Sequence, residues 1–107
     1  MKSILMMISS SPGSPNARTA LELADNLRHK GNEVALYLLQ DGVFHAVSGD
    51  KVMERMVAEK ICCYCLEEDL VMRGFRKLNL IPQAKVSSYE ELVDLMMEKY
   101  DSTIGIF

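Results

Sequence analysis

Ser3-Ile-Leu-Met-Met-Ile-Ser9 is the stretch of sequence that most directly indicates the fold. A continuous apolar run of this kind is typical of a strand that is covered on both faces, as in a parallel sheet. A loop follows at residues 10–15, and Asn16 is the predicted N-cap of a helix that continues to about Lys30. Gly31 is suited to the position just after that helix. The chain is therefore predicted to begin as strand, loop and helix.

The same alternation continues to the end of the chain. Further strands are predicted at 33–39, 60–65, 84–86 and 102–107, and further helices at 51–59, 67–73 and 88–100, with an ambiguous helical turn at 43–49. The connector at 75–82 is expected to turn Leu78, Leu80 and Ile81 inward. Alternation of strands and helices predicts an α/β fold, a three-layer α/β/α arrangement with a mainly parallel sheet of about five strands.

Composition and charge exclude several classes of protein. The 107 residues are 49% hydrophobic and 25% charged, which fits a single globular domain over residues 1–107 rather than a disordered chain. A net charge of -3 argues against direct binding of nucleic acid, because phosphate contacts need clustered Lys and Arg. No apolar run reaches the ~20 residues that span a bilayer, so no membrane association is expected. Three neighbouring cysteines cannot staple a secreted fold, which predicts a cytoplasmic location.

The carboxyl ends of the strands are the places to search for a site, because open parallel sheets bind ligands there. This rule selects the loops 9–16, 40–43, 65–68 and 87–88. Cys65 is predicted to end its strand directly before a helix, whose dipole would lower the pKa of the thiol. The acidic residues at 67–69 would raise that pKa, and Arg73 could offset them by folding back. Cys65 is therefore the candidate reactive thiol, whereas Cys62 and Cys63 are expected to lie in the core.

Other side chains carry weaker signals. The Ser10, Ser11 and Ser14 loop precedes a helix and could bind an anion, but it matches no nucleotide-binding pattern and is equally an ordinary turn. Asp41 is either a carboxylate at a strand end or part of an Asp-Gly turn. A Cys-Cys-x-Cys run on one strand points its thiols to opposite faces, and His29 and His45 lie in different elements, so no metal site is predicted. Nor is a cofactor.

Three stretches resemble the DsrE/DsrF/DsrH-like sulfur-relay family. Leu39-Gln-Asp-Gly-Val43 and Cys65-Leu-Glu-Glu-Asp-Leu-Val-Met-Arg-Gly74 are most similar to its DsrH branch. Ser11-Pro-Gly-Ser-Pro-Asn-Ala-Arg-Thr-Ala-Leu-Glu-Leu-Ala24 looks more like the DsrE branch. The resemblance implies a three-layer α/β/α domain that forms homo-oligomers, or hetero-oligomers with related subunits. It also implies exchange with sulfur donor and acceptor proteins, toward 2-thiouridine in transfer RNA or in sulfur oxidation.

The resemblance assigns roles to particular residues. Cys65 is the best match to the cysteine that carries a persulfide, Gln40 and Asp41 would line the neighbouring loop, and Arg73 would supply positive charge. Cys63 is a weaker candidate, because it could receive the sulfur only if the strand end is mobile. Transfer of this kind needs an accessible thiolate.

Two functions from different classes remain open at this point. The chain is either a sulfur carrier that uses Cys65, with sulfurtransferase-like activity, or a non-catalytic oligomeric partner or scaffold whose cysteine only packs. A small-ligand-binding module is a third alternative. Phe44 and the apolar connector at 75–82 indicate either a subunit interface or the completion of the core.

Overall fold

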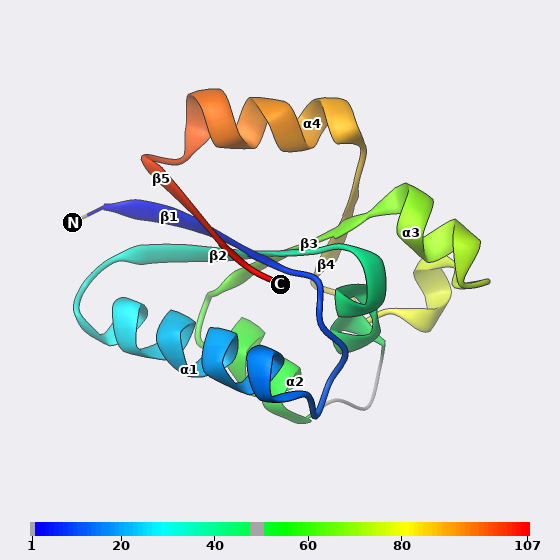
Figure 1. Cartoon of the computed structure of the whole chain (residues 1–107), viewed down its shortest axis with the longest axis horizontal. Helices are drawn as coiled ribbons and strands as arrows, with labels where there is room; N and C mark the ends of the chain where they lie inside the picture. The colour runs from blue at the N-terminus through cyan, green and yellow to red at the C-terminus, as the bar shows by residue number, and fades with distance from the viewer. Residues whose placement is uncertain (1, 48–50) are drawn as a thin grey trace.

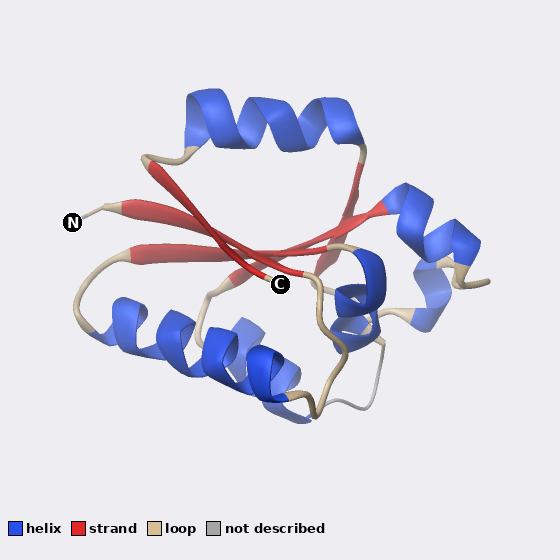
Figure 2. Cartoon of the chain, viewed as in Figure 1, coloured by secondary structure: helices blue, strands red, loops and turns tan. Residues whose placement is uncertain are grey.

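The computed structural model describes residues 2–47 and 51–107 and confirms the predicted α/β architecture. The sheet has the order β4-β3-β2-β1-β5, and every pair of neighbouring strands is parallel (Figures 1 and 2). The strands are β1 (Ser3–Ile8), β2 (Glu33–Leu38), β3 (Cys62–Leu66), β4 (Ala84–Ser87) and β5 (Ser102–Ile106). The helices are α1 (Pro15–His29), α2 (Lys51–Ala58), α3 (Glu67–Met72) and α4 (Tyr89–Asp94). Shorter turns are η1 (Gln40–Ala46) and η2 (Lys77–Asn79), both 3-10 helices, and η3 (Leu95–Lys99), a π-helical turn that continues α4.

The order of the strands explains the three layers. The chain steps in one direction from β1 to β4 and then returns past β1 to form β5. Because parallel crossovers are right-handed, the helix of the returning crossover must lie on the opposite face of the sheet from those of the first crossovers. Figure 1 shows this arrangement, with α1 and α2 beneath the sheet and α4 above it.

Alternate residues of each strand face the two layers of core. On the α1 and α2 side, β3 contributes Cys63 and Cys65 to the larger cluster, which includes Ala24 of α1 and Met53 of α2. On the α4 side, the smaller cluster packs Leu92 of α4 and Tyr100 onto the sheet. The strand residues of that smaller cluster are Leu5, Ala35, Tyr37, Tyr64 and Leu66. The expectation that Cys63 and Cys65 share one face is confirmed.

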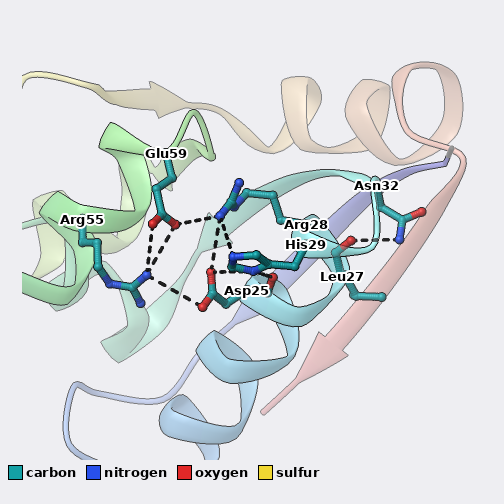
Figure 3. Close-up of polar contacts among 7 residues, drawn as sticks. All are labelled: Asp25, Leu27, Arg28, His29, Asn32, Arg55 and Glu59. Atoms are coloured by element: carbon teal, nitrogen blue, oxygen red, sulfur yellow. Dashed lines mark hydrogen bonds and ion pairs between the residues drawn. The ribbon is translucent and has the colours of Figure 1, made fainter.

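Charged side chains hold the end of α1 against the end of α2 (Figure 3). Arg28 Nη2 donates to Glu59 Oε2 at 3.0 Å, and Arg55 Nη1 lies 3.4 Å from the same oxygen. Arg55 Nη1 also lies 3.7 Å from Asp25 Oδ2. Beyond α1, the Asn32 side-chain amide donates to the Leu27 carbonyl at 3.0 Å and satisfies one of the last carbonyls of the helix.

The start of α1 differs from the prediction. Ser14, not Asn16, is the N-cap, and its Oγ accepts from the Ala17 N–H at 3.2 Å. Pro15 is suited to the first helical position, because its fixed φ is helical and it has no N–H to satisfy. Asn16 instead donates from its side-chain amide to the Phe107 carbonyl at 2.7 Å.

Three later predictions also need comment. β3 continues one residue further than expected, to Leu66. The helical turn predicted at 43–49 begins earlier, as η1, and its positions 48 and 49 lie outside the described residues. Leu80 and Ile81 are buried as predicted, but the prediction for Leu78 is wrong, since 78% of that residue is exposed on η2. Within the described ranges, no helix is long and apolar enough to cross a membrane.

Candidate functional site

The loops that follow β2 and β3 meet at the carboxyl edge of the sheet. The backbone N–H of Gln40, at the start of η1, donates to Asp69 Oδ2 at 2.7 Å. Gln40 has a φ of 51°, in the left-handed region that non-glycine residues adopt only occasionally. Asp69 lies in the first turn of α3, so this bond joins the two loops.

Arg73 folds back over the same edge, a possibility that the sequence left open. Its Nε and Nη2 donate to Asp41 Oδ1 at 3.1 and 3.0 Å. Its Nη1 donates to the Asp69 carbonyl at 3.1 Å and lies 3.6 Å from the Asp69 carboxylate. The structure therefore brings together Gln40, Asp41 and Arg73. Because the guanidinium is already engaged by two acidic residues, its charge is directed to them and not to a thiol.

Gly42 lets η1 pack directly on the end of β1. A Cβ atom at this position would overlap the carbonyl of Ile8. The same Ile8 carbonyl accepts a hydrogen bond from the Leu39 N–H at 3.1 Å. η1 contacts both β3 and α3. The carboxyl edge around these strands is therefore closed by packed backbone.

Cys65 lies beneath this closed edge, and the expectation that it is accessible is wrong. Its exposed fraction is 0%, and it belongs to the larger core cluster. The physical reason is that β3 runs on to Leu66, so Cys65 is still within the ladder, paired with Leu38 of β2 and Val86 of β4. Neither of the two pockets described below is lined by a cysteine.

Of the other two cysteines, Cys63 lies in the core as predicted, whereas Cys62 is not fully buried there. Cys63 is 1% exposed, and its thiol hydrogen-bonds to the Cys65 sulfur. That hydrogen bond, followed by burial, raises the pKa of Cys63 well above its ordinary value. Cys62 faces the α4 side and is only partly buried. All three cysteines are free of disulfides.

The serine loop is organised around the start of α1 and a buried histidine. Besides the cap made by Ser14, the Ser11 carbonyl accepts from the Ser14 N–H at 3.2 Å. The Ser10 carbonyl accepts from His45 Nε2 at 3.0 Å. His45 is 1% exposed, and its position inside η1 gave no sequence signal of this structural role. These serines therefore bond with α1 and His45 rather than with Gln40 or Asp41.

A pocket of about 410 Å³ lies beside this loop, between α1 and α2. Its lining includes Arg18 and Arg55 but also Glu22 and Asp25, so positive and negative charges are mixed around an apolar floor. An anion would meet two carboxylates as well as two guanidinium groups there. The anion site at Ser10, Ser11 and Ser14 stays a prediction from the sequence.

The surface around α3 and η2 is apolar and open. Met72 and Leu78 are 80% and 78% exposed, and the Phe44 ring packs edge-to-face on Phe75 with centroids 5.3 Å apart. A shallow pocket of about 340 Å³ lies there, with Val86 of β4 among its lining residues. Phe44 and the connector at 75–82 thus remain candidates for a subunit interface, as the sequence suggested.

Helix α4 carries a second exposed apolar surface. Val93 and Met96 are apolar residues within the helix predicted at 88–100, and the structure exposes them by 55% and 39%. Their side chains therefore belong to the outer surface, and only Leu92 of α4 itself is buried.

Comparison with known proteins places this geometry in a family. The model of the DsrH-like proteins matches residues 13–102. A protein named TusB from Pectobacterium carotovorum subsp. carotovorum is 34% identical over 95 residues, which cover 89% of this chain and 93% of that protein. A TusB from Pectobacterium parmentieri is 33% identical over the same coverage.

Solved structures agree on the fold. The ychN protein from E. coli superposes with a TM-score of 0.86 over 98% of this chain and 99% of that one, at 22% identity. A protein from Methanobacterium thermoautotrophicum gives 0.85 with the same coverage, at 12% identity. The resemblance in the loops after β2 and β3, the family match over most of the chain and the related TusB sequences lead to one conclusion. The chain belongs to the DsrH-like family of the DsrE/DsrF/DsrH group of sulfur-relay proteins.

Proposed function

We propose that this protein is a non-catalytic partner subunit of a sulfur-relay assembly, which it helps to hold together without carrying the sulfur itself. The observation that supports the proposal most strongly is the complete burial of Cys65, the cysteine that the family resemblance selects as the carrier. A carrier thiol must reach a donor sulfur outside the protein and must be ionised when it attacks.

Charge around the strand end supports the same proposal. Glu67, Glu68 and Asp69 occupy the first turn of α3, where they satisfy the helix dipole but disfavour a second negative charge nearby. Arg73, the available cation, pairs with Asp41 at 3.0 Å. Nothing at this edge is thus arranged to stabilise a thiolate, within the residues that the structure describes.

The assembly would contain related subunits of the same group, one of which supplies the reactive cysteine. The exposed apolar side chains on α3, η2 and α4 are suited to contacts of this kind, because large apolar patches on a protein surface usually mark interaction sites. The sulfur would then pass through the partner to an acceptor protein, toward thiolation of transfer RNA or in sulfur oxidation.

The carrier function is the competing proposal. In that function Cys65 would bear a persulfide, with Gln40, Asp41 and Arg73 around it and Cys63 as the second thiol. It would require η1 and α3 to separate from the end of β3, which breaks the bond from Gln40 to Asp69 and both bonds from Arg73 to Asp41.

An attempt to load the native protein with sulfur distinguishes the partner function from the carrier function. The Cys62→Ser variant retains only the two buried thiols and is incubated with L-cysteine and a cysteine desulfurase. Intact-mass spectrometry then measures any added sulfur. The partner function predicts no persulfide on the folded protein, whereas the same protein unfolded in denaturant reacts at both thiols with a small alkylating reagent. Persulfide formation at Cys65 in the folded protein would instead establish the carrier function.

A further inference from the structure

The outer side of α4 presents a row of apolar side chains to solvent. Tyr89, Val93 and Met97 are spaced by four residues and are 51%, 55% and 78% exposed. Residues at this spacing lie on one side of a helix. Met96 is 39% exposed beside them. We call these four residues the α4 stripe.

The π-helical turn at the end of α4 explains why two methionines are exposed together. The Tyr100 N–H donates to the Leu95 carbonyl at 3.0 Å, a bond that spans five residues. Leu95 packs against the smaller core cluster and Tyr100 is buried within it, so the wider turn anchors both to the sheet. Met96 and Met97 fall in the part of the turn that faces away. π turns of this kind are rare and often occur at functional sites.

A row of carboxylates runs beside the α4 stripe. Its members are Glu90, Glu91, Asp94 and Glu98, all exposed, and none forms an ion pair with another described residue. Lys99 does not offset them, because its Nζ donates to the Tyr64 hydroxyl at 3.3 Å and lies 5.6 Å from the Tyr100 ring centre. The positive charge thus turns toward the sheet, and the outer side of the helix stays acidic.

From this surface we infer that α4 is the docking face for a different protein chain, whose contact surface has an apolar centre flanked by Lys and Arg. The inference rests on the proposed function, because it names the face through which this subunit would join a related one. Apolar burial by the α4 stripe would supply affinity, and the carboxylate row would select a basic partner and speed its association.

The carboxylate row decides among the possible occupants. Two copies of this chain meeting through α4 would set four carboxylates of one against four of the other, and like charges at an interface are strongly unfavourable. Nucleic acid and anionic membranes would be repelled by the same row. A basic, apolar protein surface is the occupant whose charge complements it.

The test is co-expression with the related DsrE-like and DsrF-like chains of the same organism, followed by purification and measurement of Kd. The Met97→Glu variant places a charge in the α4 stripe, and its control is Val52→Glu, an exposed apolar residue of α2 on the opposite face of the sheet, where it is 47% exposed. We expect Met97→Glu to weaken the complex at least about tenfold and Val52→Glu to change Kd less than about twofold. Thermal unfolding of each variant alone checks that both fold.

A charge-reversal pair tests the carboxylate row separately. Asp94→Lys combined with Glu98→Lys should slow association about tenfold at low salt and reduce its dependence on ionic strength. The control is Glu22→Lys combined with Glu54→Lys, which makes the same change in net charge on α1 and α2 and should have a smaller effect.

The outcomes separate this inference from the proposed function. A complex that forms but tolerates Met97→Glu and the reversed row, or that is broken by Val52→Glu instead, would overturn the docking face and leave the partner function standing. A self-association of this chain alone that Met97→Glu abolishes would overturn the choice of occupant. Failure to form any complex would overturn both.

Discussion

Gly42 fixes how closely the segment after β2 approaches β1. A Cβ atom at this position would overlap the Ile8 carbonyl, so any larger residue would displace the backbone of β1 or of η1. Gly42 is buried and lies between Asp41 and the core residue Val43. The absence of a Cβ atom at Gly42 thus allows η1 to pack on the end of β1 and to close the sheet edge above Cys65.

Replacing Gly42 with alanine should therefore destabilise the protein. We expect the Gly42→Ala variant to lose about 1–3 kcal/mol in the free energy of unfolding, the usual cost of overpacking a well-packed site. Denaturant unfolding gives the value. The matched control is Gly105→Ala, where the added Cβ would meet only the side-chain ring of Phe107, which is 64% exposed and can move. An equal loss in both variants would contradict the close approach at Gly42.

The free energy of unfolding is expected to depend on pH through the thiol of Cys63. Its pKa is raised by the hydrogen bond to Cys65 and by burial, from an ordinary value of 9.0. The unfolded chain loses this proton at lower pH than the native protein, so the stabilisation is complete below about pH 9 and is lost as pH rises above it.

The Cys63→Ala variant should lose less stability than the natural protein as the pH rises above about 9. Between about pH 8 and about pH 10, the free energy of unfolding should fall more steeply for the natural protein than for the variant. Tyr37 and Tyr100 also have raised pKa values, through burial first, and they contribute equally to both proteins. Parallel curves for the two proteins would show that Cys63 does not titrate differently on unfolding.

At the scale of elements, the cluster shown in Figure 3 connects α1 to α2 through charge. Glu59 accepts from Arg28 and lies near Arg55, and these side chains are 27–51% exposed. Ion pairs at such partly exposed sites contribute little each, and a shared network contributes somewhat more.

The Glu59→Gln variant should consequently lose about 0.5–1 kcal/mol in the free energy of unfolding, and less at high salt. The Glu54→Gln variant removes an exposed carboxylate from the same helix and should change stability by less than about 0.5 kcal/mol. Equal effects, or no dependence on salt, would indicate that the cluster does not connect the helices.

Element by element, the fold was predictable because its signals are local. Apolar runs located the strands, and the helix predicted from residue 88 does begin there, where Ser88 Oγ accepts from the Glu91 N–H at 3.2 Å. The site was only partly predictable. The meeting of the loops at 40–43 and 65–68 followed from the rule that parallel strands end at one edge, whereas the folding back of Arg73 onto Asp41 was left open. The burial of Cys65 did not, since it depends on one extra residue in β3 and on how η1 packs over the strand.

The exposed side of α4 was likewise not predictable from the sequence. Met96 lies in the π-helical turn η3, which changes the residues that face the sheet, and no residue type announces such a turn. Val93 lies before that turn and is exposed although its neighbour Leu92 is buried. Leu78 was likewise assigned inward from its apolar character alone. Apolar residues at a docking surface and in a core look alike in a sequence, and only the packed structure separates them.

At the scale of the whole molecule, the buried and the exposed apolar side chains lie in different places. Cys63 and Cys65 are buried in the larger core cluster, whereas apolar side chains of α3, η2 and α4 are exposed to solvent. A protein built in this way is suited to bind other chains and poorly suited to exchange sulfur through its own thiols. The two exposed surfaces lie on different sides of the molecule in Figure 1, which would allow contacts with more than one neighbour.

We predict that the relay does not use the thiol of Cys65 in this subunit. The most direct measurement is the rate of sulfur transfer by an assembly reconstituted from this chain and its related subunits, with either the natural chain or the Cys65→Ala variant. We predict rates within about twofold of each other once equal assembly has been confirmed by size-exclusion chromatography. A loss of more than about tenfold in an intact assembly containing Cys65→Ala would contradict the account.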